Sequence, residues 1–294
     1  MYISPPIEGP CATHGRGMEV LLQQYEVDGD VEPLARQARA HGVPDRWRAR
    51  VWPILLGRQE GGKEGGKEGK ERRMEERGKD GGKDGGKDGV EAVRACRRAK
   101  ASPAVESAIL HFLQHPSAGG TEFSPGMLHV AGTLAEWVSA DALPACFEQC
   151  MRLMLAGDTT ARISDFLTGF ATLMPSLATY FRRERVSSWG EEWILSWMQW
   201  WCARELHPRE RARLWDVYFA CDDADAIGEM HVGVCLALLR ACRDALEELE
   251  ASEIRMVLTQ IPPVDMGQMV QQGQTLRREL QELEREDETW QATS

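Results

Sequence analysis

The sequence predicts an all-α protein, and three observations predict it. Apolar residues recur at spacings of three and four along most of the 294-residue chain, as they do on the buried face of an amphipathic helix. Several of these stretches have proline in their first turn or glycine after their last residue, which are the residues that favour helix ends. We find no convincing stretch of the apolar–polar alternation that indicates a strand. With 43% hydrophobic residues, the chain can bury the core of one large domain.

The segment His41–Gly57, HGVPDRWRARVWPILLG, carries the clearest helix signals. Pro44 has the φ angle of a first helical turn, and Asp45 complements the positive end of the helix dipole. We predict that the helix ends at Gly57. Two shorter helices are predicted before it, one over Met18–Tyr25 and one from about Leu34 to His41, and the proline-rich residues 1–14 are predicted to be irregular. The buried face of the main helix holds Trp47, Val51, Ile54 and Leu55.

Residues 60–89 interrupt the helical pattern. This tract consists of glycine and mixed charge, with 11 of the 28 glycines of the chain and one apolar residue, Met74. Such a composition cannot bury enough apolar surface to offset the entropy of ordering the chain, so we predict a disordered insertion. Its glycine pairs are not a phosphate-binding loop, because no predicted strand precedes them.

Helical patterning resumes at Val90 and continues to the end of the domain. The most aromatic stretch is Ser187–Ala220, where Trp193, Trp197 and Trp200 lie along one side of a predicted helix, and tryptophans so spaced indicate a core. The tail, residues 286–294, is predicted to be frayed. The other predicted helices cover Val90–Cys96, Pro103 to about Pro116, Phe123–Ser139, Asp141–Ala156, Thr160–Phe181, a helix from about Pro208 that holds Trp215, Met230–Leu249, Glu253–Ile261 and Met266–Arg285.

Charge and cysteine content exclude several classes of function. The formal net charge is −11 and the isoelectric point about 5.2, so nucleic acid and anionic membranes are poor partners. The 8 cysteines contain no C-x-x-C pair, which favours reduced core thiols over a zinc site or disulfides. The first residues lack a secretory signal, and no apolar run could cross a bilayer. We therefore expect a soluble cytoplasmic protein without cofactor, metal ion or direct membrane insertion.

Two motifs resemble those of TBC domains, the all-helical GTPase-activating domains that act on Rab proteins. The first is G-V-P-x-x-x-R-x-x-V-W-x-x-L-L-G, which runs from Gly42 to Gly57. The second is Leu214-Trp215-Asp216, which follows Arg204-Glu205-Leu206. The resemblance implies one TBC-like helical domain over residues 15–285, with 60–89 inserted into it.

TBC domains supply two catalytic groups to the GTPase, an arginine in I-x-x-D-x-x-R and a glutamine in Y-x-Q-G-M. Here Phe123-Ser124-Pro125-Gly126-Met127 resembles the second motif, which places Pro125 at the glutamine position. The nearest approach to the first motif is Asp88–Arg94, with Glu91 for the aspartate and Arg94 as a weak arginine-finger candidate. An arginine finger raises turnover about 10³–10⁵-fold. The resemblance therefore implies a chain without catalytic residues, a pseudo-GTPase activator and not an enzyme.

The layout of the whole chain is similar to that of the small TBC-domain subunits of the tuberous sclerosis (hamartin–tuberin) complex. This resemblance implies a scaffold that binds the C-terminal coiled coil of hamartin and contacts tuberin indirectly. Tuberin activates the GTPase Rheb and so restrains target-of-rapamycin signalling, and the complex would recruit the chain to the lysosomal or vacuolar surface. Two alternatives stay open: an active GTPase-activating protein for a Rab-type GTPase that uses Arg94, and a stand-alone adaptor that binds a small GTPase.

A coiled-coil partner needs an apolar helix face on which to dock. The candidate face consists of Val105, Ile109, Phe112 and Leu113, beside the insertion; the alternative is that this face packs into the core. His111 and His115 could share a metal ion, but no third ligand lies near them in sequence. Asp216 is expected to stabilise the fold by bonding a helix terminus, Arg48 or Arg50.

Overall fold

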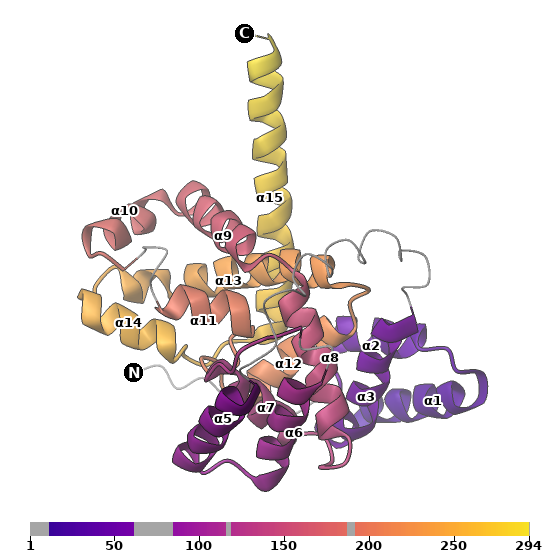
Figure 1. Ribbon diagram of the computed structural model, residues 1–294. Helices are drawn as coiled ribbons and strands as arrows, with labels where there is room; N and C mark the ends of the chain where they lie inside the picture. Colours follow the sequence, from indigo (N-terminus) through magenta and orange to yellow (C-terminus); the bar gives the residue numbers. More distant parts are fainter. Residues whose placement is uncertain (1–11, 62–84, 116–118, 187–191, 294) are drawn as a thin grey trace.

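The computed structural model describes residues 12–61, 85–115, 119–186 and 192–293, and all regular secondary structure within these ranges is helical (Figure 1). The prediction of an all-α fold is therefore confirmed. The helices are α1 (Ala12–Asp28), α2 (Glu32–His41), α3 (Asp45–Gly61), α5 (Gly85–Ala99), α6 (Pro103–Gln114), α7 (Gly126–Ala135), α8 (Leu143–Ala156), α9 (Thr159–Leu173), α10 (Pro175–Arg183), α11 (Glu192–Trp200), α12 (Pro208–Phe219), α13 (Ala224–Leu246), α14 (Ala251–Thr259) and α15 (Met266–Thr293).

Several helix ends differ from the predicted ones. α3 continues past Gly57, which keeps a helical backbone and not the positive φ of a glycine cap. The predicted helix over 160–181 is two helices, because Pro175 removes a backbone donor and starts α10. α15 continues to Thr293, so residues 286–293, for which a frayed tail is predicted, have a helical backbone.

Two predictions fall largely outside the described residues. Of the predicted insertion, residues 62–84 lie outside them, whereas 60–61 end α3 and 85–89 begin α5. Of the predicted irregular N-terminus, residues 1–11 lie outside them, and 12–14 belong to α1.

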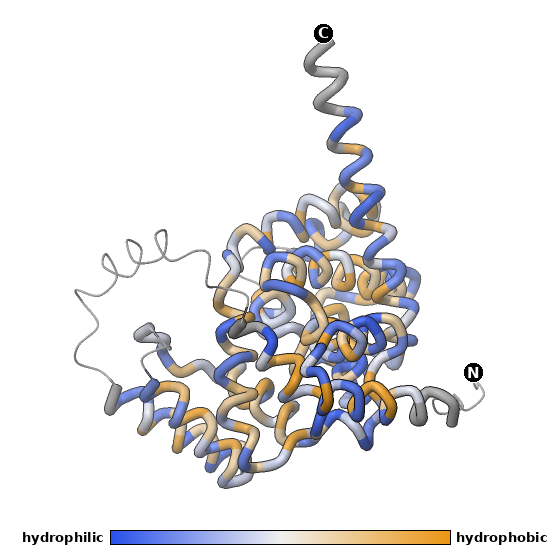
Figure 2. Tube along the Cα trace, turned by 90° about the vertical axis from the view of Figure 1, so that its right-hand side faces the viewer, coloured by the Kyte–Doolittle hydropathy of each residue, from blue (hydrophilic) through white to orange (hydrophobic). Residues whose placement is uncertain are grey.

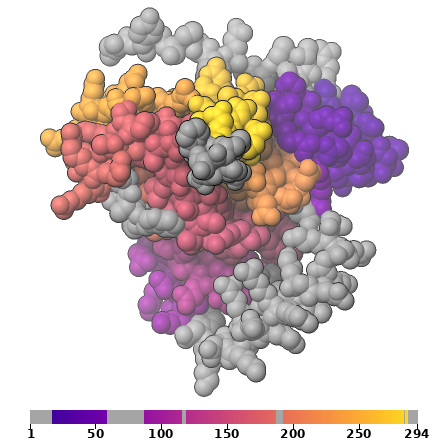
Figure 3. Space-filling view, turned by 90° about the horizontal axis from the view of Figure 1, so that it is seen from above, coloured from indigo at the N-terminus to yellow at the C-terminus, as the bar shows by residue number. Residues whose placement is uncertain are grey.

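The helices surround a central group made of α11, α12 and α13. α1, α2 and α3 lie to one side, α5, α6 and α7 below, and α9, α10 and α14 on the opposite side (Figure 1). Seen from above, α15 lies between the N-terminal helices and the segment of α9 and α10 (Figure 3). α8 packs against both α3 and α6, and α2 packs against α12, so helices from the two halves of the sequence share one core.

The core is strongly aromatic, as the tryptophan spacing predicts. Trp193 and Trp197 are buried and meet edge to face with ring centroids 5.2 Å apart. A second group joins α3 to α12, where Trp52 lies 5.1 Å from Phe219 and 6.4 Å from Trp215. Aromatic pairs in these geometries add to the stabilisation from buried area.

The buried carboxylate of Asp216 joins the two motifs that resemble TBC domains. It accepts hydrogen bonds from Arg48 at 3.0 and 2.9 Å, from Nε1 of Trp52 at 2.7 Å and from the backbone N–H of Val43 at 2.9 Å. Burial raises the pKa of Asp216, but the hydrogen bonds and charge of Arg48 oppose the rise, and four donors on two oxygens favour the ionised form. The predicted structural role of Asp216 is confirmed, with Arg48 as its partner; Arg50 pairs with Glu26 instead.

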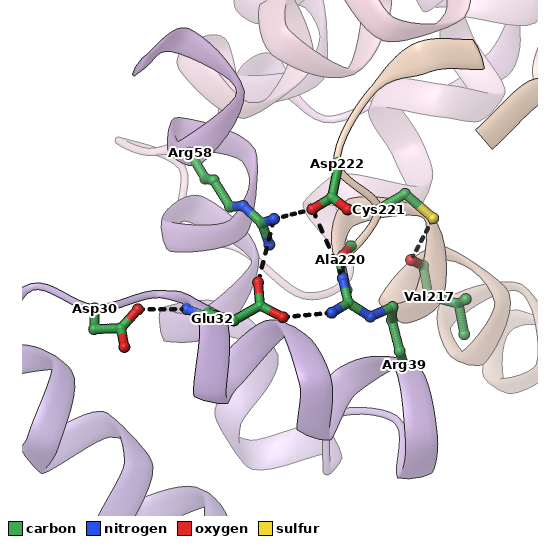
Figure 4. Close-up of polar contacts among 8 residues, drawn as sticks. All are labelled: Asp30, Glu32, Arg39, Arg58, Val217, Ala220, Cys221 and Asp222. Atoms are coloured by element: carbon green, nitrogen blue, oxygen red, sulfur yellow. Dashed lines mark hydrogen bonds and ion pairs between the residues drawn. The ribbon is translucent and has the colours of Figure 1, made fainter. Parts of the chain in front are cut away.

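Near the surface, ion pairs link α2 and α3 to each other and to the loop that follows α12 (Figure 4). Glu32 of α2 lies between two arginines, Arg39 at 2.6 Å and Arg58 of α3 at 3.3 Å. Arg58 also pairs with Asp222, in the loop between α12 and α13. Because these side chains are partly exposed, each pair stabilises the fold only weakly.

α15 crosses α13 at a very short distance. A Cβ atom on Gly273 would lie 2.7 Å from the backbone carbonyl carbon of Gly233, so neither glycine can carry a side chain without moving a helix. After this crossing, α15 leaves the body of the domain and projects from it (Figure 1). Within the described residues, no helix has the length and apolar character that a bilayer span requires.

Candidate functional site

The segment that resembles the glutamine motif forms the start of α7. Pro125 directly precedes the helix, with φ −55° and ψ −27°, and its side chain is exposed. Gly126 follows it, and a Cβ atom there would lie 2.2 Å from Cε2 of Trp200, so this position admits only glycine. Met127 is fully buried. These contacts fix the register of the motif at the helix start, with the pyrrolidine ring of Pro125 facing solvent.

Two arginines influence the electrostatics of α7. The pKa of His129 is lowered, because partial burial of its ring disfavours the charged form and because Arg204 and Arg211 add positive charge. Both arginines are already paired with acids, Arg204 with Glu192 at 3.0 Å and Arg211 with Glu136 at 3.1 Å. Both arginines therefore form ion pairs within the fold, and neither is an unpaired cation beside the start of α7.

Arg94, the weak arginine-finger candidate, lies on the exposed face of α5. The shallow hollow that it lines is formed by residues of the same helix, namely Lys87, Val90, Glu91 and Arg98. Residues at the start of α7 do not contribute to this hollow. Within the described residues, no hydrogen bond or ion pair links Arg94 to Pro125 or its neighbours.

The predicted docking face on α6 is not exposed, which corrects the sequence-based expectation. The exposed fractions of Val105, Ile109 and Phe112 are 4%, 0% and 1%, and Leu113 is half-buried. Phe112 meets Phe147 of α8 edge to face at 5.7 Å. The physical reason is that α6 packs against α5, α7 and α8, and the apolar stripe fills the space between these helices. A partner helix could reach these side chains only by unfolding the region.

The histidine pair on α6 has a packing role. The rings of His111 and His115 stack with centroids 5.7 Å apart, and Nδ1 of His115 lies 3.1 Å from Glu148 of α8. On α8, Cys146 and Cys150 are buried and free. Burial raises the pKa of Cys146 to about 11 and that of Cys150 well above its usual range, so both thiols stay protonated and unreactive.

A second group of possible metal ligands lies in the core, and the sequence analysis missed it. One ligand atom each of Cys202, His231 and Cys235 lies within 4.8 Å of the others. The spacing of His231 and Cys235 along α13 is the only sequence signal, because Cys202 is far away in the chain. Distance alone would allow a thiophilic ion such as Zn²⁺.

The hydrogen bonds of His231 argue against a metal ion at this group. Its Nε2 lies 2.6 Å from the carbonyl oxygen of Trp197, which can only accept, so Nε2 carries the proton. Its Nδ1 lies 2.8 Å from the Tyr218 hydroxyl and accepts from it. The Cys235 sulfur lies 3.9 Å from Nδ1 and 3.6 Å from Nε2, so it is nearly equidistant from the two ring nitrogens. Both nitrogens already have closer hydrogen-bond partners, which leaves neither free to bind an ion together with the sulfur. We interpret this group as a buried hydrogen-bonded cluster of the core.

Comparison with known proteins gives a partial family match and a shared fold. A family model described as the Rab-GTPase-TBC domain matches residues 120–247, a range that includes Leu214-Trp215-Asp216 and the start of α7. The Ypt/Rab-GAP domain of Gyp1p superposes with a TM-score of 0.67 and 15% identity, over 90% of this chain and 98% of that chain. The chain therefore has the fold of this domain, and the likeness in fold extends beyond the residues that the family model matches.

Other similar proteins support the same fold. The TBC domain of a Chlamydomonas flagellar RabGAP has a TM-score of 0.57 and 16% identity, over 88% of this chain and 91% of that chain. The TBC domain of Skywalker/TBC1D24 from Drosophila melanogaster, solved with inositol(1,4,5)triphosphate, has a TM-score of 0.50 and 12% identity, over 87% and 94% of the two chains. The curated Oxidant-induced cell-cycle arrest protein 5 of Debaryomyces hansenii is 34% identical over 68 residues, which are 21% of this chain and 10% of that protein. The chain thus spans about a tenth of that curated relative.

Proposed function

We propose that this chain is a catalytically inactive TBC-domain scaffold, of the type found as the small subunit of the tuberous sclerosis complex. The observation that carries the proposal is Pro125 at the start of α7. In a two-finger mechanism the glutamine side chain orients the attacking water, whereas the side chain of proline has no donor or acceptor. The contact between Gly126 and Trp200 supports the alignment of Pro125 with that glutamine, because it leaves no freedom to shift the motif by one residue.

The partner in this proposal is the C-terminal coiled coil of hamartin, with tuberin contacted through it. Support comes from the resemblance of the whole-chain layout to these subunits. It also comes from Arg94, which within the described residues makes no hydrogen bond or ion pair with the start of α7. In that complex the chain would stabilise the activator of Rheb, act upstream of target-of-rapamycin signalling, and reach the lysosomal or vacuolar surface only through its partners.

One observation favours the runner-up, an active GTPase-activating protein for a Rab-type GTPase. Arg94 is exposed, and within the described residues no hydrogen bond or ion pair is seen for its guanidinium group. It could therefore be inserted into a GTPase that approaches α5. The adaptor alternative differs from both, because it requires GTPase binding without faster hydrolysis.

Multiple-turnover GTP hydrolysis with a panel of Rab proteins separates these functions. We expect the wild-type chain to change each rate by less than about twofold, and Arg94→Ala to behave identically. An active protein would accelerate one Rab by about 10³–10⁵-fold and lose most of this in Arg94→Ala. Acceleration of that size in the wild type would overturn the proposed function, and stable binding to a GTPase without acceleration would favour the adaptor.

A further inference from the structure

Two cysteines of the core, Cys202 and Cys235, lie close together although they are far apart in the sequence. Their sulfur atoms lie within 4.8 Å of each other and of a ring nitrogen of His231. Cys202 follows the end of α11, and Cys235 lies on α13. Both helices belong to the body of the domain, where apolar residues recur along the chain, and not to the largely hydrophilic segment of α15 that leaves it (Figure 2). Two thiols this close need only a small movement to reach the length of an S–S bond, about 2.05 Å.

The two thiols differ in acidity. Burial raises the pKa of Cys202 well above its usual range, and the hydrogen bond that it shares with Cys235 raises it further. Burial also disfavours the thiolate of Cys235. The hydrogen bond from Cys202 and, to a smaller extent, His231 outweigh this effect and lower the pKa of Cys235 to about 6. Because the thiolate is the reactive form of cysteine, Cys235 is the nucleophile of the pair, and Cys202 is the thiol that resolves its product.

The turn that carries Cys202 has a strained backbone. Trp201 and Cys202 have φ angles of 48° and 54°, so two consecutive residues other than glycine lie in the left-handed region. In addition, Nε1 of Trp201 is buried, and no hydrogen bond is seen for it among the residues that the structure describes. Both cysteines have an exposed fraction of 0%, so an oxidant reaches them only through local opening. The strain favours opening at this turn, because such a backbone persists only where its surroundings hold it.

We propose that Cys202 and Cys235 are a dithiol that hydrogen peroxide converts to an intramolecular disulfide. In the first step the Cys235 thiolate attacks one oxygen of the peroxide and becomes a sulfenic acid as the O–O bond breaks. The released hydroxide takes up the proton that Cys235 lost on ionisation and leaves as water. In the second step the sulfur of Cys202 attacks the sulfur of Cys235, the S–S bond forms and the S–O bond breaks. The proton of Cys202 leaves with the hydroxide as a second water, so the two sulfurs lose the two electrons that the peroxide gains.

The disulfide would tie α13 to the turn after α11. This turn directly follows Trp200, which packs against Gly126 at the start of α7. A cross-link restricts the unfolded chain more than the folded one, so the oxidised chain should unfold at a higher temperature than the reduced chain. The inference goes beyond the scaffold function and does not depend on it, because the reaction requires no partner protein.

The test treats the full chain with hydrogen peroxide in the presence of a metal chelator, blocks the remaining thiols and analyses tryptic peptides without reduction by mass spectrometry. We expect two peptides joined through Cys202 and Cys235, which separate on reduction. The experiment is repeated in Cys221→Ser, because Cys221 shares the tryptic peptide of Cys235. In Cys202→Ser the sulfenic acid of Cys235 has no resolving thiol, and we expect dimedone to label it at least about tenfold more than any cysteine of α8.

Cys146 and Cys150 of α8 are the matched control pair. They are also buried and adjacent, but residues four apart on a helix hold their Cβ atoms about 5–6 Å apart, whereas a disulfide needs about 3.5–4.5 Å. Burial also raises the pKa of both thiols, which keeps them protonated. We therefore expect neither a cross-link between them nor labelling by dimedone.

Two results of the peroxide treatment would overturn the inference. One is the absence of a Cys202–Cys235 cross-link in the folded wild-type chain, and the other is a cross-link that forms only after the chain has been unfolded in urea. Equal labelling of Cys235 and Cys146 by dimedone would contradict the assignment of Cys235 as the nucleophile. The cross-link is measured in the wild-type chain, so the test does not require that any variant folds.

Discussion

Asp216→Asn should lower the free energy of unfolding by about 3–5 kcal/mol, which is the usual result of removing one partner from a buried ion pair. The substitution keeps the size of the side chain but removes the buried counter-charge of Arg48, which then pairs only with the exposed Asp45. It also replaces one acceptor oxygen with an amide nitrogen, and because each oxygen accepts two hydrogen bonds, two donors lose their acceptor: one from Arg48, and either Trp52 or Val43. Urea unfolding followed by tryptophan fluorescence measures the change.

Asp45→Asn is the matched control for this prediction. Asp45 pairs with the same arginine, Arg48, but its side chain is 60% exposed, so the loss should stay below about 1 kcal/mol. A loss of less than 1 kcal/mol in Asp216→Asn as well would show that the buried carboxylate does not hold the opening motif to α12.

Gly273→Ala should destabilise the chain by about 1–3 kcal/mol, because its Cβ atom would meet rigid backbone and not a movable side chain. The new atom would lie 2.7 Å from the carbonyl carbon of Gly233 and 2.7 Å from the backbone nitrogen of Val234. The strain can be relieved only by moving α15 away from α13. Thermal unfolding, together with hydrogen exchange along α15, measures the effect.

The same substitution at Gly132 of α7 should have the opposite sign. No atom lies within 4 Å of a Cβ atom built there, and alanine is a better helix former than glycine, by up to about 1 kcal/mol. Equal effects of Gly273→Ala and Gly132→Ala would contradict the close crossing of α13 and α15.

Features that depend on local spacing were predictable from the sequence. The tryptophans of α11 lie in the core because their spacing places them on one side of a helix. The pairing of Asp216 with Arg48 could also be predicted as one of two alternatives. An acid in an apolar segment needs a hydrogen-bond donor, and the motif Gly42–Gly57 contains both Arg48 and Arg50.

Features that depend on how helices pack were not predictable. The apolar stripe of α6 has the same spacing whether α8 or a partner covers it, and only the fold shows that α8 does. Trp200 against Gly126 joins residues more than 70 positions apart, and neither shows a local signal. The exposure of Leu283 follows from where the body of the domain ends, which helical periodicity does not determine.

Size-exclusion chromatography with light scattering tests the scaffold function most directly. The chain is mixed at micromolar concentration with the C-terminal coiled coil of hamartin, and each component is also run alone. The proposed function predicts one co-eluting complex whose mass exceeds that of either component. Two separate peaks with the masses of the free components would contradict it.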